Sequence, residues 1–342
     1  VTSTYQGLKA ALPQAKVILE KSEDVEKVKA AAAAADVAVV VVGYNFIDEG
    51  EYTAPAFDSN PTLKSVIPPH NGTKEADAVY DRMMNPQPTE EEVGKDNYGL
   101  GAGGDRRSLR LRPEDVEVIK AAAAANPRTV VSIVAAGAVI IEEWKDLPAA
   151  IVLSWYAGCE GGLALADLLL GKENFGGRLP FSIPVGEEHL PEYDIDATEI
   201  TYDRWFGQRL LDRLGVEAAY PLGFGLSYTT FSVSGLEVEK AQEVKDGLQV
   251  SVRVVNTGAR AGRYVAQVYG VVDVPDWPKR SLLGFQVVSL EAGEEKKVDI
   301  PASTRPLQRW KSGSWTMVSG EFGIEVGAYS GDTESARAAA TV

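Results

Sequence analysis

The densest run of hydrophobic residues lies near the start of the chain, at residues 37–42. The run is mostly β-branched and stops at Gly43, and this pattern is typical of a strand buried on both faces. Three acids, Asp48, Glu49 and Glu51, follow directly. Ligands of open α/β sheets bind outside the carboxyl ends of the strands. The three carboxylates are therefore the first candidates for acid/base chemistry.

Helical and strand patterns alternate through the first two thirds of the chain. Helices are expected at residues 5–12, 22–35, 113–125, 139–144 and 161–170, and further strands at 15–20, 128–135 and 149–155. Pro113 suits the first position of its helix, and Gly171 ends the last one. The alternation predicts an α/β sandwich with a mainly parallel sheet covered on both faces.

This alternation is interrupted between residues 53 and 104, where the sequence is rich in Pro, Asn, Gly and Asp and loses its periodicity. We expect one long insertion there, with a short helix near residues 76–84. Loops of this length without secondary structure are uncommon and usually functional.

From Phe231 onward the character of the sequence changes. Short alternating strands are expected at residues 249–256, 266–272, 296–300 and 320–328, with turn signals such as Asn-Thr-Gly and Ala-Gly between them. This pattern predicts a small antiparallel β-sandwich. We place residues 1–229 in the α/β domain and residues 230–342 in the sandwich.

Composition narrows the range of functions. The net charge of −15 argues against nucleic acid or an anionic membrane as a partner, and no apolar run is long enough to span a bilayer. With one cysteine, Cys159, and two histidines, the chain offers little for a disulfide, a zinc site or a Ser-His-Asp triad. We expect a soluble protein without metal or cofactor, either cytoplasmic or secreted. The first seven residues lack the features of a signal peptide, which suggests a processed or truncated chain.

A series of motifs then follows in a fixed order along the chain. They are Asp-Glu-Gly-Glu-Tyr at 48–52, Gly-Gly-Asp-Arg-Arg-Ser-Leu at 103–109, Ala-Asn-Pro-Arg-Thr-Val-Val at 125–131, Ser-Trp-Tyr-Ala-Gly-Cys-Glu-Gly-Gly at 154–162, Gly-Gly-Arg-Leu-Pro-Phe-Ser-Ile-Pro at 176–184, Tyr-Pro-Leu-Gly-Phe-Gly-Leu-Ser-Tyr-Thr-Thr-Phe at 220–231 and Val-Asn-Thr-Gly at 255–258. Together they resemble the carboxyl-terminal portion of glycoside hydrolase family 3 enzymes of the β-glucosidase type. The resemblance covers nearly the whole chain. It implies an α/β sandwich domain followed by a fibronectin type III-like (immunoglobulin-like) sandwich.

Two departures from the family pattern bear on function. Resembling enzymes carry a (β/α)8 barrel with the nucleophilic aspartate and most of the sugar pocket, and these 342 residues contain no such barrel. The family's first strand of the α/β domain is also absent. We therefore expect a fragment or one product of a split chain, inactive alone and needing a barrel domain or chain as partner.

The resemblance also implies roles for individual residues. The Gly-Glu-Tyr at 50–52 matches the family's acid/base loop without its second glycine, so Glu51 is expected to be the general acid/base. Glu49 is the runner-up, because a one-residue shift in an irregular loop is easy. Tyr52 is expected to line the substrate site. The alternative is that all three acids form a solvated face of the loop.

Two further pairs of residues are candidates for substrate binding. Asp105 and Arg106 are expected to fix the returning end of the long loop, or alternatively to contact substrate. Trp205 and Phe206 are expected to stack on sugar rings, or alternatively to form a core aromatic cluster. The neighbouring Trp155 and Tyr156 are expected to pack structurally, and Cys159 is expected to be a small buried filler.

The sequence thus favours the acid/base-bearing part of a retaining, exo-acting β-glycosidase, of β-glucosidase type, acting on terminal β-D-glucosyl residues of a β-linked oligosaccharide or glycoside. A β-xylosidase of the same family is one alternative, because sugar selectivity would lie mainly in the missing barrel pocket. A non-catalytic carbohydrate-binding or scaffolding chain is the other.

Overall fold

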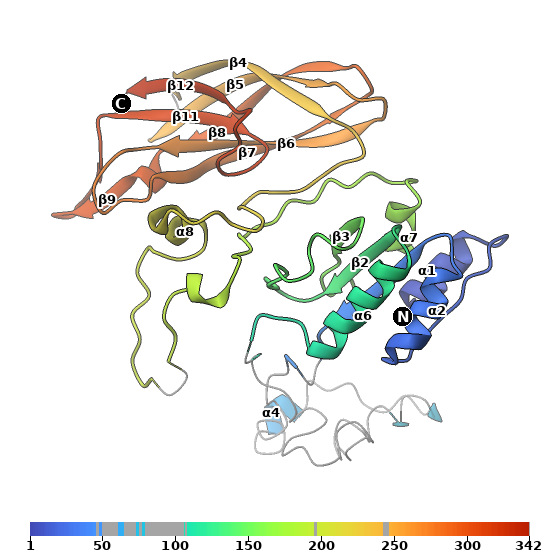
Figure 1. Cartoon of the computed structure of the whole chain (residues 1–342). Coiled ribbons are helices and arrows are strands. Elements are labelled where there is room, and N and C mark those ends of the chain that lie inside the picture. Colours follow the sequence, from blue (N-terminus) through green and yellow to red (C-terminus); the bar gives the residue numbers. More distant parts are fainter. Residues whose placement is uncertain are drawn as a thin grey trace. The chain divides into compact units, whose positions relative to one another are not determined.

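The computed structural model describes residues 1–45, 48–49, 61–64, 73–74, 77–78, 106, 108–194, 197–241 and 246–341 (Figure 1). The chain divides into two compact units. The first, here called the sheet unit, comprises Glu20–Val139 and Trp144–Ala157. The second, the sandwich unit, comprises Val1–Leu19, Ile140–Glu143 and Gly158–Val342. Each unit is described by itself.

The sheet unit is built on three parallel strands in the order β1-β2-β3. These are β1 (Ala38–Gly43), β2 (Thr129–Val134) and β3 (Ala150–Leu153). Helices α2 (Val25–Ala33) and α6 (Pro113–Ala125) pack against each other, and α6 lies along β1 and β2. Figure 1 shows α6 running alongside β2. The parallel sheet expected from the alternation of elements is confirmed.

Local sequence explains where the two helices begin. Pro113 occupies the first turn of α6, and the small side chains of Ala121 and Ala122 are buried, which lets the helix approach its neighbours closely. Helix α2 begins later than expected. Its N-cap is Asp24, whose carboxylate accepts hydrogen bonds from the backbone of Glu26 and Lys27.

Three expectations for the first 157 residues were wrong. Strand β1 buries Val40 and Val42 but leaves 46% of Val41 exposed, so it is not buried on both faces. Residues 15–20 form no strand, because no described neighbour pairs with this largely exposed segment. Residues 139–144 form a turn and an isolated bridge rather than a helix. The apolar residues of this segment are fully buried. In a short apolar run, the sequence pattern of a buried irregular segment cannot be distinguished from that of a buried helix. A short helix α4 (Pro61–Lys64) is described in the long insertion, whereas most of the expected helix at 76–84 lies outside the described residues.

Two antiparallel sheets form the sandwich that follows Thr230. One contains β4 (Phe231–Lys240), β5 (Gly247–Asn256) and β8 (Glu295–Ser303). The other contains β12 (Ala336–Thr341), β11 (Glu321–Gly327), β6 (Gly262–Val271) and β7 (Arg280–Leu290). A separate hairpin joins β9 (Gln308–Lys311) to β10 (Ser314–Met317). Alternate residues such as Val250, Val252 and Val268 fill the space between the two sheets, so the expected all-β sandwich is confirmed. The domain boundary at residues 229 and 230 stays a prediction.

Helices α1 (Thr4–Ala11) and α7 (Gly161–Leu169) of the sandwich unit cross at two glycines. A Cβ atom built on Gly7 would lie 2.0 Å from the carbonyl oxygen of Gly162. Since real Cβ atoms do not approach backbone this closely, only glycine fits at this crossing. The unit also contains η2 (Glu187–His189), η3 (Arg305–Leu307) and α8 (Gln208–Leu214).

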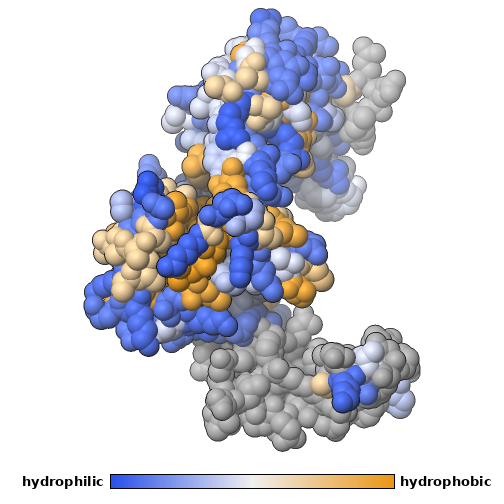
Figure 2. All heavy atoms as spheres, turned by 90° about the vertical axis from the view of Figure 1, so that its right-hand side faces the viewer, coloured by the Kyte–Doolittle hydropathy of each residue, from blue (hydrophilic) through white to orange (hydrophobic). Residues whose placement is uncertain are grey.

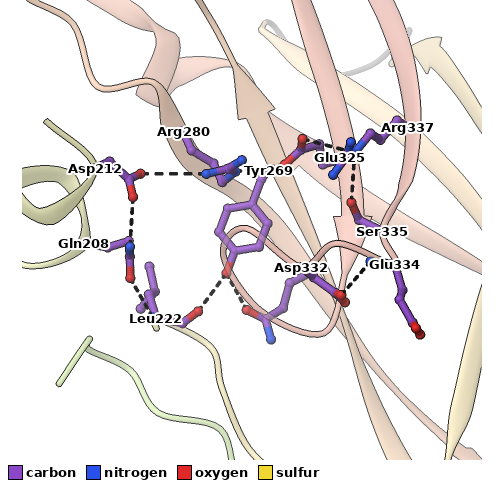
Figure 3. Close-up of polar contacts among 11 residues, drawn as sticks. Gln208, Asp212, Leu222, Tyr269, Arg280, Glu325, Asp332, Glu334, Ser335 and Arg337 are labelled. Atoms are coloured by element: carbon purple, nitrogen blue, oxygen red, sulfur yellow. Dashed lines mark hydrogen bonds and ion pairs between the residues drawn. The ribbon is translucent and has the colours of Figure 1, made fainter. Parts of the chain in front are cut away.

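Helix α8 is tied to the sandwich by a polar network (Figure 3). The guanidinium of Arg280 lies 2.8 Å from Glu325 and 3.8 Å from Asp212, and all three side chains are at most 16% exposed. Beside it, the Tyr269 hydroxyl donates to Gln267 Oε1 at 2.6 Å. The network connects β6, β7 and β11 with α8.

The hydropathy of the surface differs between the β-sandwich and the helical region. Figure 2 shows hydrophilic residues over most of the displayed face of the sandwich, while apolar residues reach the surface in the helical region. Leu163 and Leu170, in and directly after α7, are each 38% exposed. None of the helices in the described ranges has the length and apolar character needed to cross a membrane.

Candidate active-site region

The candidate site lies at the carboxyl edge of the sheet unit. Because β1 and β3 are parallel, the residues that follow them meet at the same edge. Tyr44, Asp48 and Glu49 follow β1, and Tyr156 follows β3. Asp48 stabilises the turn by accepting a 3.0 Å hydrogen bond from the backbone N–H of Asn45.

Glu49 is held by both oxygens of its carboxylate. Oε1 lies 2.6 Å from Nε of Arg106, and Oε2 accepts a hydrogen bond from the hydroxyl of Tyr156. Only 15% of the Glu49 side chain and 13% of the Arg106 side chain are exposed. An ion pair this shielded from water is stronger than one at the surface.

Arg106 makes two more contacts with this edge. Its guanidinium donates to the carbonyl of Ala138 at 3.1 Å and lies 4.5 Å from the ring centroid of Tyr44. The Tyr44 hydroxyl in turn donates to the carbonyl of Arg110 at 2.6 Å. Arg106 therefore fastens the segments that follow β1, β2 and β3 to one another, and we call Glu49, Arg106 and Tyr156 the carboxylate clamp.

The two tyrosines of this edge have pKa values above the ordinary tyrosine value. Burial raises the pKa of Tyr156, and its hydrogen bond to Glu49 raises it further. Burial also raises the pKa of Tyr44, although the neighbouring Arg106 acts in the opposite direction. Both hydroxyls therefore remain hydrogen-bond donors at neutral pH.

The structure describes only some of the candidate residues. Glu51, Tyr52 and Asp105 lie outside the described residues. Arg106 fixes the edge as expected for the returning end of the long loop, and its partner is Glu49. The other two candidates belong to the sandwich unit. Trp205 is half-buried beside a cavity of about 160 Å³, and Phe206 is 53% exposed, so Phe206 is not part of an aromatic core.

Three neighbouring residues differ from expectation. Tyr156 does not simply pack, because it is 51% exposed and binds Glu49. Trp155 is 37% exposed and has a positive φ of 54°, a conformation that costs energy in a bulky residue. Cys159 is exposed rather than a buried filler, because it lies in the loop between β3 and α7. The position of Tyr156 directly after a parallel strand was the signal that could have identified it.

We searched the described side chains of this edge for groups that could bind a metal ion. Among the residues that the structure describes, no group of three or more His, Cys, Asp or Glu side chains is arranged to hold a metal ion. The carboxylate clamp instead satisfies its charges internally, through a guanidinium and a phenol.

Comparison with known proteins agrees with this architecture. A β-glucosidase of Bacteroides ovatus is 35% identical over 254 residues, which cover 70% of this chain and 34% of the relative. A xylan 1,4-β-xylosidase of Xylanibacter ruminicola is 33% identical over 218 residues, which cover 63% of this chain and 24% of the relative. The chain thus spans about a third or less of these curated relatives.

A solved structure shares the fold, and two family models match the sequence. The fold matches a β-D-glucoside glucohydrolase of Trichoderma reesei with a TM-score of 0.77 and 23% identity, covering 99% of this chain and 45% of that one. The model of the glycosyl hydrolase family 3 C-terminal domain matches residues 1–228, and that of the fibronectin type III-like domain matches residues 264–330. The chain therefore belongs to glycosyl hydrolase family 3, of which it contains the carboxyl-terminal domain and a fibronectin type III-like domain.

Proposed function

We propose that this chain supplies the general acid/base, Glu51, of a retaining, exo-acting β-glucosidase. Retaining hydrolysis needs two carboxyl groups about 5–5.5 Å apart, one to protonate the leaving oxygen and one to attack the anomeric carbon. The attacking aspartate would come from a (β/α)8 barrel in a longer protein or a separate chain. The limited share of its relatives that the chain spans is compatible with such an additional module.

The occupied carboxylate of Glu49 is the observation that carries this proposal. The two candidate glutamates are separated by a single residue. Both oxygens of Glu49 are already engaged, one in the ion pair with Arg106 and one as the acceptor of a hydrogen bond from Tyr156. A general acid must present a carboxyl oxygen to the leaving group. Glu49 is better placed to hold the chain, which favours Glu51 as the proton donor.

The carboxylate clamp would then act as a positioning device. A displacement of about 1 Å at a reacting group can cost roughly 100-fold in rate. Arg106 and Glu49 fix the chain two residues before Glu51 and, at the other end of the insertion, directly after Asp105. Direct contacts of Tyr52, Asp105 or Arg106 with substrate remain part of the proposal.

Trp205 and Phe206 are proposed to contact the sugar. Phe206 presents half of its surface to solvent, and Trp205 borders a cavity. Sugar rings have apolar C–H faces that pack well on such aromatic side chains.

One alternative substrate class has specific support. The xylosidase among the relatives supports a β-xylosidase as the second candidate function. The two activities differ in whether the pocket accepts the hydroxymethyl group of glucose, so paired assays on β-glucosides and β-xylosides distinguish them.

The test combines the 342-residue chain with a separately produced family 3 barrel. We expect no hydrolysis of p-nitrophenyl β-glucoside or cellobiose by the chain alone, and hydrolysis by the mixture. Glu51→Gln should lower kcat/KM by about 10²–10⁴-fold on cellobiose. The loss should be smaller on the p-nitrophenyl substrate, whose leaving group needs little protonation.

Azide identifies which glutamate carries the proton. In a variant without its acid/base, azide can attack the glycosyl-enzyme without being deprotonated. We expect azide to restore turnover and yield glucosyl azide with Glu51→Ala, and not with Glu49→Ala. Undiminished cellobiose hydrolysis by Glu51→Gln in an active mixture would contradict the assignment. Hydrolysis without any barrel would contradict the need for a second module.

A further inference from the structure

A second pocket, in the sandwich unit, gathers positive charge although the chain as a whole is strongly acidic. It has a volume of about 250 Å³. Its lining residues come from the segment before α8, from α8, from the loop before β7, from η3 and from the start of β9. They are Arg204, Arg209, Trp277, Pro278, Arg305, Pro306 and Gln308. None of them is a carboxylate, whereas the chain carries a net charge of −15.

The arginines of this pocket have no acidic partners within the described ranges. By contrast, Arg106, Arg112, Arg213, Arg253, Arg280 and Arg337 each form an ion pair with a carboxylate. Burial lowers the pKa of Arg209, and the positive charge of Arg204 beside it lowers it further. Arginine nevertheless stays charged in proteins. Like charges held together in this way would be stabilised by a bound anion.

Aromatic rings accompany these cations. The guanidinium of Arg204 lies 4.1 Å from the ring centroid of Trp277, and that of Arg309 lies 5.4 Å from it. Arg305, which lines the pocket, lies 3.6 Å from the ring centroid of Trp315. The pocket therefore continues onto the hairpin of β9 and β10.

The hairpin presents two tryptophans side by side. Trp310 and Trp315 are cross-strand partners with ring centroids 5.3 Å apart, and they are 59% and 44% exposed. Cross-strand partners in a sheet face the same side. We call the three tryptophans and three arginines, Arg204, Arg209, Arg305, Trp277, Trp310 and Trp315, the arginine–tryptophan surface.

We propose that the arginine–tryptophan surface binds an acidic saccharide, one whose sugar units carry carboxylates, such as a chain of hexuronic acids. The C–H faces of the sugar rings would pack on the tryptophans. Their carboxylates would accept paired hydrogen bonds from the planar guanidinium groups, for which arginine is well suited. A pocket of 250 Å³ is large enough for about one sugar ring.

This inference goes beyond the proposed hydrolysis and does not depend on Glu51. Binding at this surface would hold the chain on an acidic polysaccharide whatever the activity at the carboxylate clamp. Failure of the proposed hydrolysis would be seen in the activity assays, and failure of this inference in a binding measurement.

The test is titration calorimetry of the 342-residue chain with three probes of similar length. They are trigalacturonate, the neutral trisaccharide cellotriose and the peptide triglutamate. We expect trigalacturonate to bind and its affinity to fall as salt is added. The other two probes should bind at least about tenfold more weakly, because each lacks either the charge or the sugar ring. Equal binding of cellotriose or of triglutamate, or no binding of trigalacturonate, would overturn the proposal.

Substitutions locate the site. Arg305→Gln, at an exposed position, and Trp315→Ala should each weaken trigalacturonate binding about tenfold. Arg253→Gln is the matched control, because Arg253 is exposed, paired with Glu295 and outside the arginine–tryptophan surface. An unchanged affinity in both Arg305→Gln and Trp315→Ala, with circular dichroism showing folded protein, would place the binding elsewhere and overturn the proposal.

Discussion

Nε of Arg106 lies 2.6 Å from Oε1 of Glu49, and this ion pair joins two positions of the chain that flank the long insertion. Both side chains are largely buried, and the second oxygen of Glu49 is bound by Tyr156. The edge of the sheet is thus fixed by side chains that need not touch a substrate.

Arg106→Met tests how much this ion pair stabilises the sheet unit. The substitution leaves Glu49 largely buried without its cation, so we expect the free energy of unfolding to fall by about 3 kcal/mol. Urea unfolding followed by tryptophan fluorescence measures the change. Arg128→Met, at an exposed position without an ion pair among the described residues, should change it by less than about 0.5 kcal/mol. Similar losses in both variants would contradict a specific role for the pair.

Tyr156→Phe removes one hydroxyl from the carboxylate clamp and leaves the ring in place. In the active mixture with a barrel we expect kcat/KM on cellobiose to fall about tenfold, because Glu49 is then held on one side only. The pH profile should keep its shape, since Tyr156 is not the proton donor. Tyr193→Phe is the control, because Tyr193 is 64% exposed. A displaced pH profile in Tyr156→Phe would mean that the tyrosine takes part in proton transfer.

Arg280→Met tests the network between α8 and the sandwich. It leaves the mostly buried Asp212 without a cation and leaves Glu325 with Arg337 alone, so we expect a loss of about 3 kcal/mol in unfolding free energy. Arg253→Met breaks an exposed pair with Glu295 and should cost less than about 1 kcal/mol. Chemical denaturation of the three proteins gives the comparison, and equal costs would refute the importance of burial.

Gly7→Ala tests the crossing of α1 and α7. The new methyl group would lie 2.0 Å from the backbone of Gly162, so the helices must separate, at a cost of about 2 kcal/mol or more. Gly320→Ala introduces the same methyl group where no atom lies within 4 Å, and it should have little effect. Thermal unfolding midpoints measure both variants. An unchanged midpoint in Gly7→Ala would show that the crossing is looser than described.

Alkaline pH should destabilise the sandwich through Tyr269. Burial raises its pKa above the ordinary value of about 10. Above pH ~10 the tyrosine loses its proton in the unfolded chain but keeps it in the folded one. Its contribution to the free energy of unfolding is therefore fully present below pH ~10 and is lost as the pH rises toward the pKa of the folded state. Urea unfolding at about pH 9 and about pH 11 should show a smaller decline for Tyr269→Phe than for the native chain. Tyr193→Phe, which changes an exposed tyrosine, should decline like the native chain.

Helices and strands could be predicted from the sequence where local propensity and end signals agree with the structure that the residues adopt. Helix α6 begins at Pro113 and ends at Ala125 as expected, because the proline fixes its first turn and the alanine-rich stretch has a high helix propensity. Strand β4 was missed, because a β-bulge between Ser234 and Glu237 breaks the alternation of apolar and polar residues and the strand lies at a sheet edge.

The candidate site was predicted only in part. Glu49 and Arg106 were singled out by motif, but their ion pair joins residues on opposite sides of a long insertion. No local pattern encodes such a contact. Tyr156 was missed as a partner because an aromatic residue after a strand reads as packing unless the sheet order is known.

The meeting of Gly7 with Gly162 also has a consequence for the order of events during biosynthesis. Helix α1 leaves the ribosome long before α7 has been translated, so its close-fitting partner does not yet exist. Contacts between residues so distant along the chain form slowly, because a large loop must first be closed. Helix α1 is therefore synthesised before α7 but reaches its final place only once α7 is present.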